Sequence, residues 1–389
     1  MNQRSRLATL SATLALLFAG GHAQAADYGK LERWRSFSGV SWDASAAPFA
    51  DSANTPIAGL HGDSQGRLFV STPRWISARV PATLNLLDTR HDSGPARLSA
   101  FPSALDNALD AAPDKTLRSV LGFHVDRTNG WLWALDMGYV AGEQEAPPGG
   151  QKVVILDLAS GAVLRRIPLD AYADRRASFL NDIVVDEKRK LAYIADSGVR
   201  GQDAGLIVVD LPAGRTRRVL DRDPLVQAEA GAKVVSHGQE VLPGHPLEIG
   251  INGIALSPDA GTLYWTVTSG NRARAVPTRI LRDWSSTDGQ IRAQVETIGE
   301  VGGSSDGMLA DRDGDLLITD LGRNGVVRYD HRGKTMQLIA SSPDIYWPDT
   351  LDALADGDLL FTSSALNQHF MGAVHAGSEH YDIWRLHRM

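Results

Sequence analysis

The chain has 389 residues, contains no cysteine, and carries a formal net charge of -7 with 43% hydrophobic residues. The lack of cysteine excludes disulfides, thiolate catalysis, zinc–thiolate sites and iron–sulfur clusters. The mildly acidic, ordinary globular composition argues against a disordered chain and against a nucleic-acid partner, which would require a basic stripe.

The first residues have the pattern of a secretory signal peptide. Two arginines precede the almost wholly apolar stretch 7–18, and the small-residue cleavage site 23–25 follows it. The apolar run is about a dozen residues, shorter than the roughly 20 that span a bilayer. We expect residues 1–25 to be cleaved and residues 26–389 to form an exported protein, periplasmic or secreted, with no membrane span. The alternative is an anchor that the mature protein retains.

One short pattern recurs six times after this segment: a few apolar residues, an Asp-Gly-type turn, and a second apolar stretch. In one copy, the turn 311–314 separates Gly307–Ala310 from Leu316–Thr319. Asp-Gly pairs tolerate the positive φ of tight hairpin turns. The copies are roughly 43 to 72 residues apart, near the period of four-stranded propeller blades. We therefore predict an all-β fold, a single six-bladed β-propeller over residues 26–389; the alternative is a pair of β-sandwiches.

The two ends of the mature chain offer a way to close the ring. The strand candidate Leu31–Phe37 can share a blade with the C-terminal candidate Tyr381–Leu386, which would leave no free edge. Helical periodicity is scarce between them, and short helical turns are expected only within 102–117 and 280–284.

The first strand of each blade lines the channel of a propeller, so the residues that open these strands meet near one mouth. Four consecutive blades offer Asn181, Asn252, Asp306 and Asp349 at this position, whereas the first two blades offer nothing polar. Two carboxylates and two amides suit a hard divalent cation, Ca²⁺ first and Mg²⁺ second. The alternative is that these side chains only bond nearby backbone groups at the strand starts.

Several motifs carry a resemblance to a known family. They are 67–75, 80–85, 130–136, 179–186, 253–259 and 347–351. In their order and number they resemble the Yellow / major royal jelly protein family, in its bacterial branch, over nearly the whole mature length. The resemblance implies a secreted six-bladed propeller. It implies little about chemistry, because members range from pigment-pathway factors to amine binders and food proteins.

Three of the strand starts also resemble the senescence marker protein / gluconolactonase family of propellers. There a metal is held by a Glu in the first blade and by Asn, Asn and Asp in later blades. Asn181, Asn252 and Asp306 match the last three, but Ala58 or Gly59 stands in place of the Glu. Asp349, from the neighbouring blade, is our own candidate to replace the missing charge.

Two functions remain open from these residues. With a cation bound, lactonase-like hydrolase or isomerase chemistry is expected, with Asp306 or Asp349 as the base toward water. The alternative is a non-catalytic binder of small amine or aromatic ligands, or a pigment-pathway factor, without metal. No protein partner is evident.

Four further residues are candidates for ligand contacts in this pocket. They are Arg74, Trp75, His124 and Trp347. Each has a structural alternative: the arginine can stack on a packed tryptophan, the histidine can be a hydrogen-bonded channel residue, and Trp347 can pack between blades.

Overall fold

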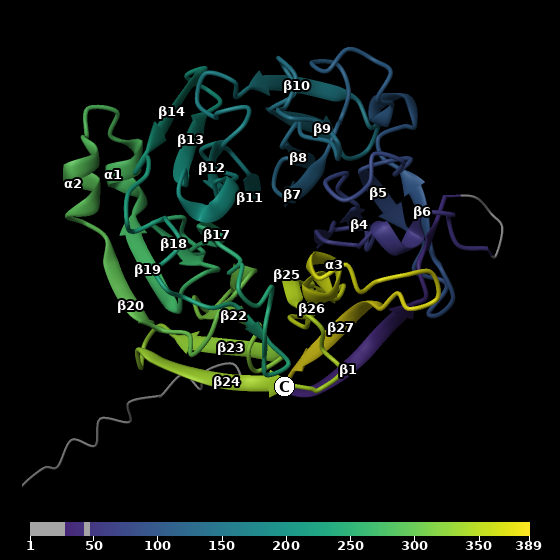
Figure 1. Cartoon of the computed structure of the whole chain (residues 1–389). Helices are drawn as coiled ribbons and strands as arrows, with labels where there is room; N and C mark the ends of the chain where they lie inside the picture. Colours follow the sequence, from purple (N-terminus) through teal and green to yellow (C-terminus); the bar gives the residue numbers. More distant parts are fainter. Residues whose placement is uncertain (1–27, 43–46) are drawn as a thin grey trace, which may run out of the picture.

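The computed structural model describes residues 28–42 and 47–389, so the predicted signal peptide 1–25 lies outside the described residues. Six sheets of mainly antiparallel strands are arranged in a ring around a central channel (Figure 1). In each sheet the first three strands from the channel outward follow the order of the chain. The predicted all-β, six-bladed β-propeller is confirmed. The first blade gains a fifth strand, which pairs in parallel with its outer edge.

Each blade begins with its innermost strand at the channel and continues outward. The strands in this order are β3 (Leu60–Gly62), β4 (Leu68–Ser71), β5 (Leu84–Leu87), β6 (Ala96–Ala100) and β2 (Val40–Ser41) in blade one; β7 (Val120–Asp126), β8 (Trp131–Asp136), β9 (Lys152–Asp157) and β10 (Val163–Pro168) in blade two; β11 (Leu180–Asp186), β12 (Leu191–Asp196), β13 (Gly205–Asp210) and β14 (Arg215–Val219) in blade three; β17 (Ile251–Leu256), β18 (Thr262–Val267), β19 (Arg272–Pro277) and β20 (Glu296–Glu300) in blade four; β21 (Met308–Ala310), β22 (Leu316–Asp320), β23 (Gly325–Asp330) and β24 (Thr335–Ser341) in blade five; and β25 (Pro348–Ala353), β26 (Leu359–Ser363), β27 (Tyr381–Arg388) and β1 (Tyr28–Phe37) in blade six.

The remaining elements are short. They are the hairpin β15 (Val235–Ser236) and β16 (Gln239–Glu240), the α-helices α1 (Thr278–Arg282), α2 (Asp288–Arg292) and α3 (Leu366–Phe370), and the 3₁₀ turns Ser52–Asn54, Leu105–Asn107 and Val199–Gly201. The turns expected within 102–117 and 280–284 are thus present. Within the described ranges, no helix is long and apolar enough to cross a membrane.

The ring is closed by the first and last strands of the described chain. β1 pairs antiparallel with β27, with Leu31 opposite Leu386 and Phe37 opposite Tyr381. This is the pairing that the sequence predicted. Closure completes blade six, because its outermost strand comes from the opposite end of the described chain.

The apolar core is divided among the junctions between blades. Six clusters of buried side chains each join two neighbouring blades, as Tyr193 and Trp265 do between blades three and four. Alternating apolar residues therefore face the next blade on both sides of each sheet, and this packing fixes the inner strands around the channel.

The inner strands approach one another closely near one mouth of the channel. A Cβ added to Gly253 would lie 2.5 Å from the carbonyl oxygen of Asp306 in the next blade, and Gly122 and Gly307 are packed against their neighbours in the same way. Glycine at these positions allows backbone to touch backbone. The residues beside these glycines are thereby gathered around a narrow axis.

Candidate functional site

A repeated backbone irregularity directs polar side chains toward the channel. The pairing of inner and second strands shifts register at Asn181, at Asn252 and at Asp349. Such β-bulges re-aim a side chain and are frequent beside functional sites. Asp306 lies just before β21, where its N–H and that of Gly307 both donate to Oγ1 of Thr319, at 2.9 and 3.0 Å.

The structure brings the four predicted residues together. Asn181, Asn252, Asp306 and Asp349 line one cavity of about 240 Å³ at the end of the channel, which we call the near cavity. Asn252 Nδ2 donates to Asp306 and, at 2.8 Å, to Oγ1 of Thr268. Their contacts are thus made mainly with other side chains and not with their own backbone.

The two amides that line this cavity bond to other side chains through their nitrogens. Asn181 Nδ2 donates to Oγ of Ser197 at 3.1 Å, and this hydroxyl donates in turn to the carbonyl of Ile251 at 2.5 Å. Oδ1 of Asn181 and Oδ1 of Asn252 accept no hydrogen bond from the described residues. Each oxygen is available to a ligand.

The walls of the near cavity are aromatic. Trp75 lies 5.4 Å from Phe179 and 6.0 Å from Phe370 between ring centroids, and Trp347 lies 5.5 Å from Phe370. Trp75 and Trp347 were predicted to contact a ligand, and both line the cavity. The indole N–H of Trp75 is buried and has no hydrogen-bond partner among the described residues. It is a donor for which the protein supplies no acceptor.

Trp347 is held in an uncommon backbone conformation. Its φ is 60°, in the left-handed region that bulky residues rarely adopt. The side chain is 1% exposed, and its N–H donates to Oδ2 of Asp306. Strain of this kind persists where the surroundings enforce it, most often at functional sites.

A roof of chain segments outside the blades covers the near cavity. Leu366 of α3 packs with Trp347 and with Val234 and Val241, which flank the β15–β16 hairpin. In Figure 1 α3 lies near the middle of the ring. Sequence reasoning missed this roof and Phe370 with it, because a five-residue helix leaves almost no periodic signal.

Three acidic side chains lie along the channel, and two of them, Asp306 and Asp349, line the near cavity. Burial raises the pKa of Asp306 to about 6, although hydrogen bonds from Trp347 and Asn252 oppose the rise. Burial is the main cause that raises the pKa of Asp349 well above its ordinary value, and the negative charges of Asp306 and Asp182 raise it further. None of the sixteen described residues that line the near cavity is Lys, Arg or His.

Asp182 is the third of these acids and was not singled out from the sequence. It follows Asn181 in β11, and burial raises its pKa to about 7. The equivalent position is Gly59, Gly122, Gly253 or Gly307 in four of the other blades. When the copies of the repeat are aligned, an acidic residue at a position that is otherwise mostly glycine is the signal that could have revealed Asp182.

Two predicted ligand contacts lie elsewhere. Arg74 is 1% exposed, does not line the near cavity, and donates five hydrogen bonds to backbone carbonyls. It holds loops together, and these contacts lend no support to its prediction as a ligand contact. His124 lies three residues beyond Leu121 along β7, about 10 Å farther along the strand, and lines a different cavity.

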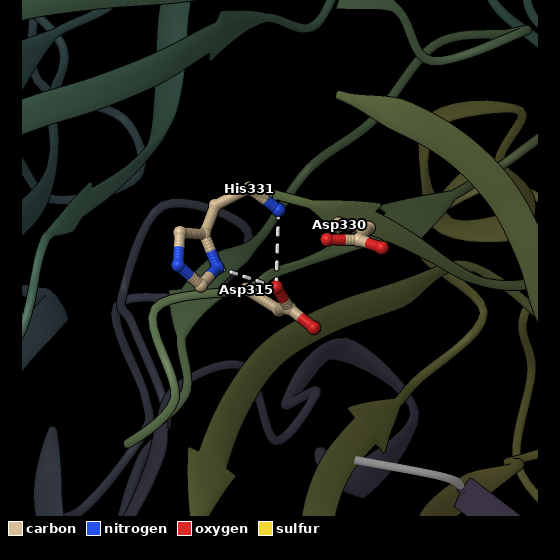
Figure 2. Close-up of side chains that lie close together, drawn as sticks. All are labelled: Asp315, Asp330 and His331. Atoms are coloured by element: carbon tan, nitrogen blue, oxygen red, sulfur yellow. Dashed lines mark hydrogen bonds and ion pairs between the residues drawn. The ribbon is translucent and has the colours of Figure 1, made fainter. Parts of the chain in front are cut away.

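A second group of possible metal ligands lies outside the channel. Asp315, Asp330 and His331 offer ligand atoms within 4.8 Å of one another, and the described part of the chain holds no other such His/acidic group. Figure 2 shows the backbone N–H and Nδ1 of His331 directed at one oxygen of Asp315, at 3.0 and 2.7 Å. Arg328 Nε donates to the other oxygen at 2.7 Å. These atoms are engaged with one another, which is typical of a structural ion-pair cluster.

The model of the major royal jelly protein family matches residues 118–388, more than half of the chain. The chain belongs to the major royal jelly protein family. Among its relatives, the yellow proteins of Drosophila subobscura and Drosophila melanogaster are each 30% identical to it over 233 residues, 57% of this chain. The match covers 39% and 41% of those proteins, so the chain spans about two fifths of their length.

Solved propellers share the fold of this royal jelly family member. Regucalcin from Agrobacterium tumefaciens, described as a calcium-binding protein, superposes with a TM-score of 0.53 at 17% identity, covering 86% of this chain and 92% of its own. A gluconolactonase from Xanthomonas campestris gives 0.52 at 17% identity, covering 94% and 98%. At these identities the likeness concerns the fold alone.

The first blade of this royal jelly family member offers no acidic ligand at the channel mouth. Ala58 is fully buried, and a Cβ on Gly59 would meet the carbonyl oxygen of Leu121 at 2.7 Å. Neither residue lines the near cavity, and Leu121 lines it from blade two. Blades one and two therefore contribute only apolar or aromatic side chains, Trp75 and Leu121, to the near cavity.

Proposed function

We propose that the near cavity binds a small organic cation with an aromatic body, such as an arylalkylamine. One observation carries the proposal: acidic side chains converge, without a basic partner, at one end of a cavity whose walls are aromatic. A buried carboxylate is costly unless a positive charge accompanies it. An ammonium ion supplies that charge, and a ring fills the apolar space.

Asp349 is the residue we assign to the ammonium group. Both oxygens of Asp306 already accept hydrogen bonds, from Asn252 and from Trp347. Asp349 accepts only a long one, 3.4 Å from Oγ1 of Thr350. A cation beside Asp349 lowers its raised pKa and so favours the ionised form. Binding should therefore release a proton where Asp349 is protonated beforehand.

Calorimetry with a matched pair of ligands tests this function. Tryptamine and tryptophol carry the same ring, but the second has a hydroxyl in place of the ammonium group. We expect tryptamine to bind at least about tenfold more tightly, and Asp349→Asn to abolish the difference. Asp110→Asn, at an exposed position, is the control. Equal affinities for the two ligands in the unmodified protein would overturn the proposal.

A second candidate is a divalent cation site with lactonase-like chemistry. It is favoured by the two amides and two carboxylates of four consecutive blades, which line one cavity. Asn181, Asn252, Asp306 and Asp349 would hold Ca²⁺ or Mg²⁺. When bound, such an ion supplies Lewis-acid polarisation of a carbonyl. Asp306 or Asp349 would then take the proton from the attacking water.

The fit of this second candidate is incomplete, because blade one adds no charge and Asp306 is engaged on both oxygens. Metal analysis and thermal melting before and after EDTA decide it, since removal of a tightly bound ion lowers the melting temperature. Hydrolysis of a lactone panel is compared with Asp306→Ala. Absence of metal together with an unchanged melting curve would exclude it.

We also propose that the protein is exported and loses residues 1–25. The support is the signal-peptide pattern of the sequence. Cell fractionation and mass spectrometry of the purified protein test this proposal. We expect a mature chain that begins at Ala26 in the periplasm or medium, and a cytoplasmic protein with an intact N-terminus would refute it.

A further inference from the structure

The opposite mouth of the channel holds a larger cavity of about 370 Å³, which we call the far cavity; its lining includes His61, His124 and Asp182. This volume lies in the range of small-molecule sites. The far cavity shares no lining residue with the near cavity. The far cavity is therefore a separate site, and a ligand bound there does not require the function proposed for the near cavity.

The first histidine is held in one orientation by a buried carboxylate. His61 Nδ1 lies 3.2 Å from Oδ1 of Asp352, whose other oxygen accepts from the Gly62 N–H at 2.9 Å and from Arg127 Nη2 at 2.7 Å. Burial acts to raise the pKa of Asp352, but the His61 hydrogen bond and the nearby positive charges keep it below the ordinary value. An ionised Asp352 can only accept, so His61 carries its proton on Nδ1. Its Nε2 remains for a ligand.

The second histidine is oriented in the same manner. His124 Nε2 lies 3.2 Å from Oε1 of Glu187, whose other oxygen accepts from the Thr128 N–H at 3.0 Å. Burial acts to raise the pKa of Glu187, but these hydrogen bonds and the charge of His124 lower it to about 2. The carboxylate is thus the acceptor, and Nδ1 of His124 has no protein partner among the described residues.

Asp352 and Glu187 differ from the acids of the near cavity because both are already paired. Asp352 has three donors and Glu187 has two, so neither requires a cation. Both imidazoles retain unused hydrogen-bonding capacity, as does Asp182, whose Oδ1 accepts the Ile183 N–H at 2.8 Å. Each of them can donate or accept according to its protonation.

The hydroxyl groups of a ligand can both donate and accept hydrogen bonds, so they can pair with imidazole and carboxyl groups in either protonation state. Apolar side chains such as Leu309 and Leu351 line the far cavity between them and offer contact to C–H groups. We propose that the far cavity is a second binding site, for a neutral polyhydroxylated molecule, with His61 and His124 as its principal hydrogen-bonding residues.

Saturation-transfer NMR with D-glucose, D-mannitol and myo-inositol tests the site on the full purified protein. We expect saturation of at least one polyol in the unmodified protein. His61→Ala and His124→Ala should each weaken its apparent affinity by about tenfold. Since Gln retains the size and a hydrogen bond to the carboxylate, His61→Gln and His124→Gln should lose less.

Two further measurements serve as controls for this test. Melting curves of the four histidine variants determine whether they fold, and tryptamine binding reports separately on the near cavity. If tryptamine fails to bind, the polyol result still stands, because the cavities share no residue. The proposal is overturned if no polyol shows saturation, or if saturation is undiminished in both alanine variants.

Discussion

The indole N–H of Trp347 donates a hydrogen bond to Oδ2 of Asp306, and the two residues precede the inner strands of neighbouring blades. The contact fixes the carboxylate on one side while Asn252 fixes it on the other. It also accounts for a bulky residue at a φ of 60° inside the protein. Blades five and six are thus joined at the site by a bond between side chains.

Replacing this tryptophan by phenylalanine should cost stability. Trp347→Phe keeps an aromatic ring but leaves the buried Oδ2 of Asp306 without its donor, so we expect a loss of about 1–3 kcal/mol in urea unfolding at pH 7. The matched control is Trp384→Phe, because the buried N–H of Trp384 has no partner among the described residues. Equal losses in the two variants would mean that ring packing, and not the hydrogen bond, is responsible.

Asp182 should make the protein less stable as the pH rises. Its pKa in the folded protein is about 7 against an ordinary 3.8, so the folded state binds the extra proton between these values. The contribution of Asp182 protonation to the free energy of unfolding is therefore fully present below about pH 4 and is lost as the pH rises through 7. Asp182→Asn should gain on the order of 2 kcal/mol at pH 8 and almost nothing at pH 4. Thermal melting at the two pH values measures this difference, and a gain of the same size at both would disprove the assignment.

Close contact between inner strands should make glycine indispensable at the channel mouth. Gly253→Ala places a Cβ 2.5 Å from the backbone oxygen of Asp306, so the strands must separate, at a cost of about 2 kcal/mol or more. Gly289→Ala is the control. That glycine lies in α2 with no atom nearer than 3.9 Å to the added methyl group, and alanine favours helix. Urea unfolding of both variants is the measurement, and a neutral Gly253→Ala would contradict the packing.

Arg74 should be irreplaceable by lysine. Its guanidinium donates five hydrogen bonds to carbonyls in three separate segments, whereas an ammonium group has at most three donors. We expect Arg74→Lys to cost about 3 kcal/mol, because buried carbonyls lose their partners. The exposed Arg90→Lys, paired with Asp88 at the surface, should change little. Chemical unfolding compares the two, and near-neutral behaviour of Arg74→Lys would be inconsistent with this role.

The sequence predicted the ring because its signals are local and repeated. Apolar strands on either side of turns such as 311–314 define hairpins, and six hairpins imply six blades. The observed pairing of Leu31 with Leu386 agrees with the closure predicted from the two terminal strands. The convergence of the four strand-start residues on one cavity follows from the same alignment of copies, since equivalent positions of a symmetric ring share a mouth.

The features that escaped prediction depend on contacts between distant segments. The carbonyls that hold Arg74 are up to 44 residues away along the chain. Phe370 reaches the near cavity from a short helix that the propeller pattern does not include. Asp182 stands beside the more conspicuous Asn181, and its raised pKa depends on burial, although its place among glycines of the other blades was a signal in the sequence.

The pairing of β1 with β27 also constrains how the protein is made. A ribosome delivers residues 28–37 long before residues 381–388, so the nascent chain must keep its first strand unpaired throughout synthesis of everything between them. Contacts so distant along the chain form slowly, and an exposed strand edge in the meantime attracts other chains. Asp349 belongs to the blade that is finished last. We therefore expect the near cavity to be complete only once β27 has paired with β1, and a chain that ends before β27 to lack the closed ring.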